Sequence, residues 1–280
     1  MNKANFLALC YADIFSYPLT FKEFTKWQIK CKANSKISLN FFKKEGKYYF
    51  LNGRKKNVLI RQERLRFSDS KKLIAQKISS SLRYIPWVKM IALTGALAME
   101  NGKKDDDIDL LIITAERRVW LTRFLTTLLL EIMGVRRRPG IQNWSNKICL
   151  NLFLDEQQLH FSPTERNLYL AHEILQTKCL FNKEHTFEKF LLANQWVKKD
   201  LPRAFPRRLI SLKQSKSFIN RLLSKPLDLV EKLFFLLQLT YMKPKITLEK
   251  IEERRIFFHP RATANLILTE YQKRLVRYFS

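Results

Sequence analysis

The stretch that decides the fold is Leu93-Thr94-Gly95-Ala96-Leu97-Ala98, followed twelve residues after Gly95 by Asp107-Ile108-Asp109. An apolar run from Val88 leads into the glycine turn, and a second apolar run begins at the two carboxylates. On a β-strand, residues i and i+2 point to the same side. Asp107 and Asp109 can therefore present their oxygens together, as proteins do to hold Mg²⁺ and the phosphates that it carries.

This pattern resembles the signature of the nucleotidyltransferase superfamily, which includes the DNA polymerase β-like enzymes. In that signature a Gly-Gly or Gly-Ser turn and a spacer precede Asp-apolar-Asp or Asp-apolar-Glu. The text TGALAMENGKKDDDIDLLIIT is similar to small bacterial nucleotidyltransferase-domain proteins. The segments YADIFSYPLTFKEF, RRRPG and NKICLNLFLDE resemble one uncharacterised bacterial branch with an N-terminal winged-helix segment. The resemblance covers most of residues 1–200, and FFHPRAT extends it weakly into the tail.

The resemblance implies a cytoplasmic enzyme that uses Mg²⁺, or Mn²⁺, with an NTP as substrate. Asp107 and Asp109 would be the catalytic metal ligands. Gly95 and Ala96 would bind the triphosphate through backbone N–H groups, which suit anions at the start of a helix. The implied reaction transfers NMP from the NTP to a hydroxyl acceptor and releases pyrophosphate.

The sequence departs from the superfamily at two positions, and these departures support an alternative. Ala96 stands where the signature usually has Ser. The usual third carboxylate, on the strand Ile148–Leu154, matches Asn151, which cannot accept a proton. Asp155 is the next candidate base on that strand. The alternative function is a catalytically degenerate member that binds nucleotide or nucleic acid as a regulator, either toxin–antitoxin-like or transcriptional.

Composition indicates a soluble protein with an anionic partner. The 280 residues are 46% hydrophobic and carry a net charge of +27. The electrostatic field of this charge favours binding to nucleic acid or to an anionic membrane surface, although a lysine-rich genome would produce the same charge without any partner. Four scattered cysteines form no zinc-binding pattern and suit the reducing cytoplasm. The most apolar runs are interrupted by charges, so we expect no transmembrane segment.

Residues 1–66 predict a winged-helix-like domain. The expected helices are Asn5–Phe15, a second that begins after the capping box at Thr20 and runs to about Lys30, and a third near Ser38–Phe42. Lys47–Leu51 would form the wing. In such domains the third helix enters the major groove, although many serve as protein-binding modules. The bases along this surface would be Lys36, Lys43, Lys44, Lys47, Arg54, Lys55 and Lys56.

Residues 67–160 predict a small mixed-sheet nucleotidyltransferase core in an α/β or α+β arrangement. A long basic helical segment, Val58–Tyr84, leads into it and is expected to break near Ser68-Asp69-Ser70. The expected core elements are strands Val88–Leu93, Ile108–Thr114 and Lys147–Leu154, with helices Gly95–Asn101 and Arg118–Met133. Arg136-Arg137-Arg138 would either cap the second helix or grip phosphates.

Residues 161–280 predict a helical C-terminal region. The expected helices are Thr164–Leu175, Glu184–Lys199, Lys216–Tyr241 and Ala262–Phe279. His172, which precedes Glu173 on the first of these, is interpreted as a surface or hydrogen-bonded core histidine rather than a catalytic base. The same interpretation applies to His259.

Overall fold

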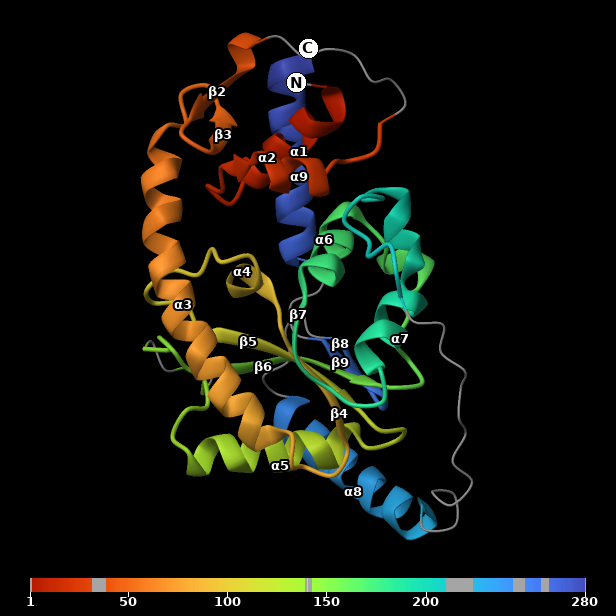
Figure 1. Cartoon of the computed structure of the whole chain (residues 1–280). Helices are drawn as coiled ribbons and strands as arrows, with labels where there is room; N and C mark the ends of the chain where they lie inside the picture. The colour runs from red at the N-terminus through yellow and green to blue at the C-terminus, as the bar shows by residue number, and fades with distance from the viewer. Residues whose placement is uncertain are drawn as a thin grey trace.

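A computed structural model of the chain describes residues 2–31, 39–138, 140, 143–209, 224–243, 250–257 and 262–279. Within them the chain is a mixed α/β protein with a three-stranded antiparallel sheet and a six-stranded mixed sheet. Figure 1 shows the N-terminal elements and α9 (Ala262–Phe279) at one end. The large sheet lies in the middle, and α5 (Val119–Ile132) and α8 (Ser224–Met242) lie at the other end.

The large sheet has the strand order β7-β4-β5-β6-β9-β8. Strands β5 and β6 are parallel, and the other neighbours are antiparallel. The three predicted strands are confirmed to within one residue. The bounds are β4 (Val88–Leu93), β5 (Ile108–Thr114), β6 (Ile148–Asp155), β7 (Lys178–Asn182), β8 (Lys250–Glu252) and β9 (Arg255–Phe257).

The prediction that the chain after Pro163 is almost entirely helical is wrong, because β7, β8 and β9 complete the large sheet. Helix α9 is confirmed at its predicted bounds, and α8 is confirmed over its described part, whereas the other two predicted helices are shorter than expected. Helix α6 (Leu168–Gln176) begins after Asn167, whose side chain accepts a hydrogen bond from the Leu170 N–H. Helix α7 (Thr186–Ala193) stops at the buried Asn194, whose amide bonds the backbone of Leu159 and Phe161 instead. A separate 3₁₀ helix, Gln195–Lys199, follows.

Two of the expected helices are confirmed in the N-terminal unit, which comprises residues 2–31 and 39–51. They are α1 (Lys3–Asp13) and α2 (Phe21–Lys26). The capping box at Thr20 forms as predicted, with Glu23 bonded back to the Thr20 N–H at 2.8 Å.

The third predicted helix is wrong in its described part. Leu39–Phe41 is a single 3₁₀ turn, and the chain then enters β2 (Phe42–Glu45). That strand pairs with β3 (Tyr48–Leu51) as a hairpin, and β1 (Leu19–Thr20) pairs on the other edge of β3. Cross-strand pairing has overridden the helical pattern. Lys36 and Ser38 lie outside the described residues.

Helix α3 (Lys56–Leu82) runs unbroken along one side of the molecule and joins the N-terminal sheet to the core (Figure 1). The expected break at Ser68 is absent from it, because that side chain is buried and accepts a hydrogen bond from the Gly102 N–H at 3.0 Å. One turn on, the buried Lys71 ammonium donates to the Asp106 carbonyl at 2.6 Å. Tertiary contacts thus give hydrogen-bond partners to the polar side chains that had predicted a break in the helix.

The two faces of the large sheet carry separate hydrophobic clusters. One cluster joins α1, β4, α6 and α9 through residues such as Phe6, Met90, Leu170 and Ile267. The other packs β5 against α5, with Ile112 beside Trp120. The first cluster draws on all three predicted domains. The division at residues 66 and 160 therefore stays a prediction, and hydrophobic packing crosses both boundaries.

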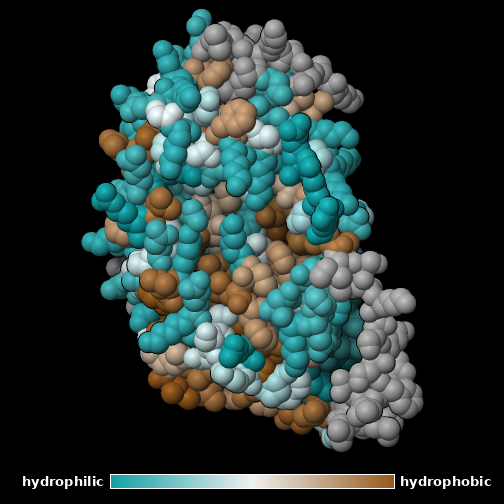
Figure 2. Space-filling view, in the orientation of Figure 1, coloured by the Kyte–Doolittle hydropathy of each residue, from teal (hydrophilic) through white to brown (hydrophobic). Residues whose placement is uncertain are grey.

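The visible surface is mostly polar, with apolar side chains along its lower edge, where α5 and α8 lie (Figure 2). Exposed apolar residues of these helices include Ile132, Leu229 and Leu233. Among the described helices, none is both long and apolar enough to cross a bilayer.

Candidate functional site

The glycine turn and Asp109 are in direct contact. Strands β4 and β5 pair Leu93 with Leu110, and the Thr94 N–H donates to the Asp109 carbonyl at 3.1 Å. The chain then turns at Gly95, with φ of +63°, into the short helix α4 (Gly95–Ala98). A Cβ at Gly95 would lie 2.9 Å from Asp109 Oδ2. Both the positive φ and this close approach require glycine.

Asp107 and Asp109 converge as predicted, and Cys149 of β6 completes the cluster. One side-chain ligand atom from each of the three lies within 4.8 Å of the other two. Burial and the Asp107 charge raise the pKa of Asp109 to about 7, while a hydrogen bond from Cys149 and the charge of Arg137 oppose the rise. Burial also raises the pKa of the Cys149 thiol. The site therefore concentrates negative charge, which Arg137 partly offsets.

The placement of Asn151 beside the carboxylate pair is wrong, and Cys149 lies there instead. The register pairs Asp109 with Cys149, then shifts, so that Leu111 pairs with Leu152. Asn151 falls in this irregularity, which breaks the alternation that the prediction assumed.

Asp155, the alternative base, lies at the other end of β6. It pairs with Thr114, five residues beyond Asp109 on β5. Its carboxylate is fully buried and accepts hydrogen bonds from the N–H groups of Arg117 and Gln157, each at 2.8 Å. Asp155 therefore closes a turn and is remote from the site.

The three consecutive arginines have different partners, and phosphate binding by them stays a prediction. Arg136 and Arg138 both pair with Glu131 near the end of α5, at 2.5 and 2.7 Å. Arg137 donates to Asp107 Oδ2 at 2.6 Å, and its guanidinium lies 4.7 Å from the Trp144 ring centre. Only the middle arginine reaches the carboxylate cluster.

A third carboxylate approaches the glycine turn from α6. Burial and the Asp109 charge raise the pKa of Glu173 to about 7, and the Gly95 N–H, which faces this carboxylate, acts in the opposite direction. The sequence marked Glu173 only as a polar residue on a predicted helix. Its approach to Gly95 depends on how α6 packs on the sheet, which no local pattern encodes.

Glu173 also borders a cavity of about 150 Å³ between the N-terminal unit, α4 and α6. The cavity is rich in aromatic rings. The lining residues are Ala8, Tyr11, Ala12, Phe15, Tyr17, Leu19, Trp27, Gly95, Ala96, Met99, Asn101, Tyr169, His172, Glu173, Gln176 and Thr263.

His172 is a core histidine, as interpreted from the sequence. Its ring stacks on Tyr11 with centres 3.9 Å apart, and its Nδ1 shares a hydrogen bond with Gln176 at 3.3 Å. Burial lowers the pKa of His172 to about 3, so the ring is neutral at physiological pH. His259 lies outside the described residues.

The predicted basic surface is partly free and partly paired. Lys43, Lys44 and Lys47 are exposed on the hairpin of β2 and β3. Arg54 instead lies 3.6 Å from Asp13, and Lys55 lies 3.0 Å from Glu45. A nucleic-acid interface at this end would therefore use the hairpin.

Comparison of the chain with family models, with curated proteins and with solved structures found no match.

Proposed function

We propose that this chain is a nucleotidyltransferase that uses Mg²⁺ or Mn²⁺ to transfer NMP from an NTP to a hydroxyl acceptor. The observation that carries the proposal is the contact between the Gly95 turn and Asp109, beside Asp107. A phosphate-binding turn and a pair of metal-binding carboxylates must meet for metal-assisted phosphoryl chemistry. Here both come from consecutive strands of one sheet, which fixes their relation.

The residues present fit a hard divalent ion. Mg²⁺ prefers oxygen ligands, and Asp107 and Asp109 supply them. Burial, together with the Asp107 charge, raises the pKa of Asp109, and a divalent ion would favour its ionised form. A thiol is a poor ligand for Mg²⁺, so we assign no ligand role to Cys149. The ion would neutralise charge on the transferring phosphoryl group.

Phosphate binding and proton acceptance would be carried out by residues of the chain itself. Arg137 is suited to bind phosphate oxygens with its planar donor fork. The acceptor oxygen bonds to the α-phosphorus, pyrophosphate leaves with the electron pair, and the hydroxyl proton passes to a base. Because Asp155 is remote, Asp109 and Glu173 are the carboxylates that we place close enough to the Gly95 turn for this role.

A specific contact also favours the alternative, a degenerate member that binds nucleotide without catalysis. Arg137 forms an ion pair with Asp107 at 2.6 Å. A permanent ion pair of this kind would compete with a metal ion for the same oxygen. In that case the chain would bind an NTP through Arg137 and the turn, and would transfer nothing.

The test replaces Asp109 with Asn and measures two quantities. Calorimetry should show that the full chain binds a non-hydrolysable NTP with Mg²⁺, and that Asp109→Asn weakens this binding by about tenfold or more, equivalent to about 1.4 kcal/mol. The control is Asp105→Asn, an exposed carboxylate in the same loop, which should bind like the wild type.

Incubation with labelled NTP, Mg²⁺ or Mn²⁺ and total RNA or small hydroxyl compounds then measures transfer. Transfer by the wild type that Asp109→Asn abolishes supports the enzyme. NTP binding with no transfer to any acceptor supports the alternative. Equal NTP affinity in wild type and Asp109→Asn contradicts the metal assignment.

A further inference from the structure

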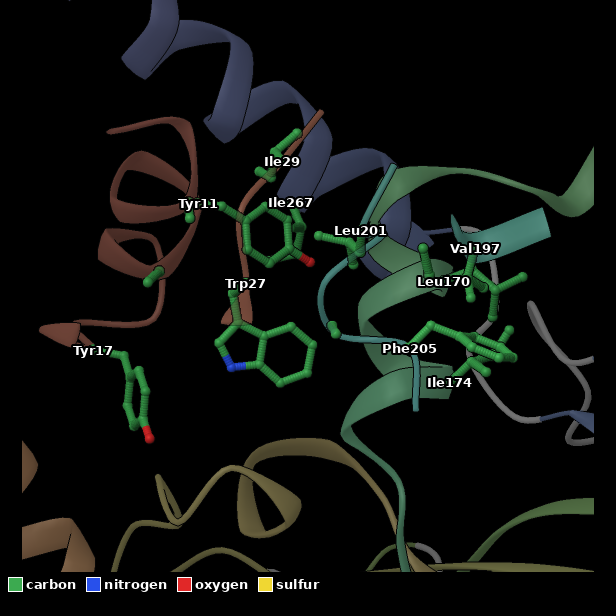
Figure 3. Packing of buried hydrophobic residues seen from close by; sticks show 14 of the residues in the cluster. Tyr11, Tyr17, Trp27, Ile29, Leu170, Ile174, Val197, Leu201, Phe205 and Ile267 are labelled. Carbon is green, nitrogen blue, oxygen red and sulfur yellow. The ribbon is translucent and has the colours of Figure 1, made fainter. Parts of the chain in front are cut away.

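The aromatic cavity lies directly beside the Gly95 turn. Both Gly95 and Ala96 line it on one side, and the N-terminal unit closes it on the other. In Figure 3 the rings of Tyr11, Tyr17 and Trp27 project from the N-terminal segments. A molecule in this cavity would therefore lie next to the proposed site of phosphoryl transfer.

The charge of the cavity contrasts with that of the whole protein. The chain has 52 Lys and Arg against 25 Asp and Glu. Among the described residues that line the cavity, Glu173 is nevertheless the sole charged side chain. Its interaction with Asp109 shows that the negative carboxylate cluster is close by. The cavity therefore disfavours an anion and favours a cation or a hydrogen-bond donor.

The aromatic lining and the volume of the cavity further limit the class of ligand that it can bind. Aromatic rings, among them those of Tyr11, Trp27 and Tyr169, line the cavity, and such rings attract cations and pack against other rings. A volume of about 150 Å³ is similar to that of an engineered protein cavity that holds one benzene molecule. A single ring fits, and a polynucleotide or a folded protein segment does not.

We propose that this cavity is the acceptor site, and that it takes a small ring compound that carries the accepting hydroxyl and also an amine, which the Glu173 carboxylate binds. The assignment of the cavity as the acceptor site rests on the proposed function. The class of ligand that it takes rests on the cavity alone. The nucleotide would then be transferred to a small cationic molecule and not to nucleic acid or protein.

The test uses three probes that share one benzyl-sized ring and differ in charge: benzylamine, benzyl alcohol and benzoate. Calorimetry on the full chain at about 0.15 M salt, where the overall field is screened beyond about 8 Å, compares their affinities. Benzylamine should bind at least about tenfold more tightly than benzoate, with benzyl alcohol between them. Glu173→Gln should abolish the preference for benzylamine, and Glu63→Gln, an exposed carboxylate on α3, should leave it unchanged.

The probe series on the wild type needs no variant, so it decides the charge preference even if Glu173→Gln does not fold. Equal binding of all three probes, tighter binding of benzoate, or no binding overturns the inference. If NTP and Mg²⁺ bind but benzylamine does not, the acceptor site is wrong and the proposed function stands. If benzylamine binds but NTP does not, the proposed function fails and the acceptor assignment fails with it.

Discussion

At the scale of single residues, Gly95 links the backbone to the candidate chemistry. Replacing it with Ala places a methyl group 2.9 Å from the Asp109 carboxylate oxygen and forces an L-residue into the left-handed region. We expect Gly95→Ala to lower the free energy of unfolding by about 2 kcal/mol and to abolish NTP binding. Urea unfolding and calorimetry measure the two effects.

Gly53→Ala is the matched control for that change. Gly53 also has positive φ, but nothing lies within 4 Å of its added Cβ. It should therefore show only the backbone cost, about 1 kcal/mol, and should bind NTP normally. Indistinguishable behaviour of the two variants would mean that the approach of Gly95 to Asp109 is unimportant.

His172 makes stability depend on pH. Its pKa of about 3 in the folded chain lies below the unfolded value of about 6.5, so the unfolded state binds the proton more tightly. Its contribution to stability is complete above pH 6.5 and is lost progressively as the pH falls toward 3. Between pH 7.5 and pH 5 the wild type should lose about 2 kcal/mol relative to His172→Gln.

Urea unfolding at several pH values measures this difference. The exposed His160→Gln is the control, and its unfolding free energy should follow that of the wild type across the range. Parallel profiles for the wild type and His172→Gln would show that the ring is not held neutral by burial.

At the scale of elements, an ion pair fastens α2 to the first turns of α3. Arg61 donates to both Glu23 oxygens, at 2.9 and 2.6 Å, and the Tyr17 hydroxyl donates to the same carboxylate. Both side chains are largely buried. Arg61→Met leaves the carboxylate without its cation and should cost about 3 kcal/mol of unfolding free energy.

Arg66→Met, on the same helix but exposed, is the control for helix propensity and should change the unfolding free energy by less than about 0.5 kcal/mol. Thermal or urea unfolding compares the pair. A loss below about 1 kcal/mol for Arg61→Met would indicate that α2 is held in place by apolar packing alone.

The elements also show what the sequence could predict and where it could not. Strands β4, β5 and β6 follow from long apolar runs, and the contact of Gly95 with Asp109 follows from their sequential pairing. Cys149 was missed because its position opposite Asp109 depends on the register of β6 against β5, which no local pattern gives. Strand β7 was missed because it is short and pairs with β4, which is distant in sequence. The hairpin of β8 and β9 was missed because both strands are short and join the sheet through the distant β6. Glu173 was missed because its approach to Gly95 depends on how α6 packs on the sheet.

At the scale of the whole molecule, the net charge of +27 predicts salt-sensitive binding of nucleic acid. If the hairpin contacts phosphates, Lys43→Glu with Lys44→Glu should weaken binding and reduce the log–log salt slope by about 2. Lys198→Glu with Lys199→Glu changes the net charge equally on another exposed surface and should preserve more of the slope. Fluorescence anisotropy with labelled duplex DNA and RNA measures both. Equal losses would indicate a nonspecific field without a hairpin interface.

The packing of α9 on α1 has a consequence for synthesis of the chain. Arg274 bonds to Asp13 at 3.0 Å, and the Tyr271 hydroxyl donates to the Leu7 carbonyl at 3.5 Å. The large sheet likewise acquires three of its strands only after residue 177 has been made. During synthesis, α1 therefore stays without this cover until α9 has emerged from the ribosome. Contacts between segments so distant in sequence slow folding and leave apolar surface transiently exposed in the nascent chain.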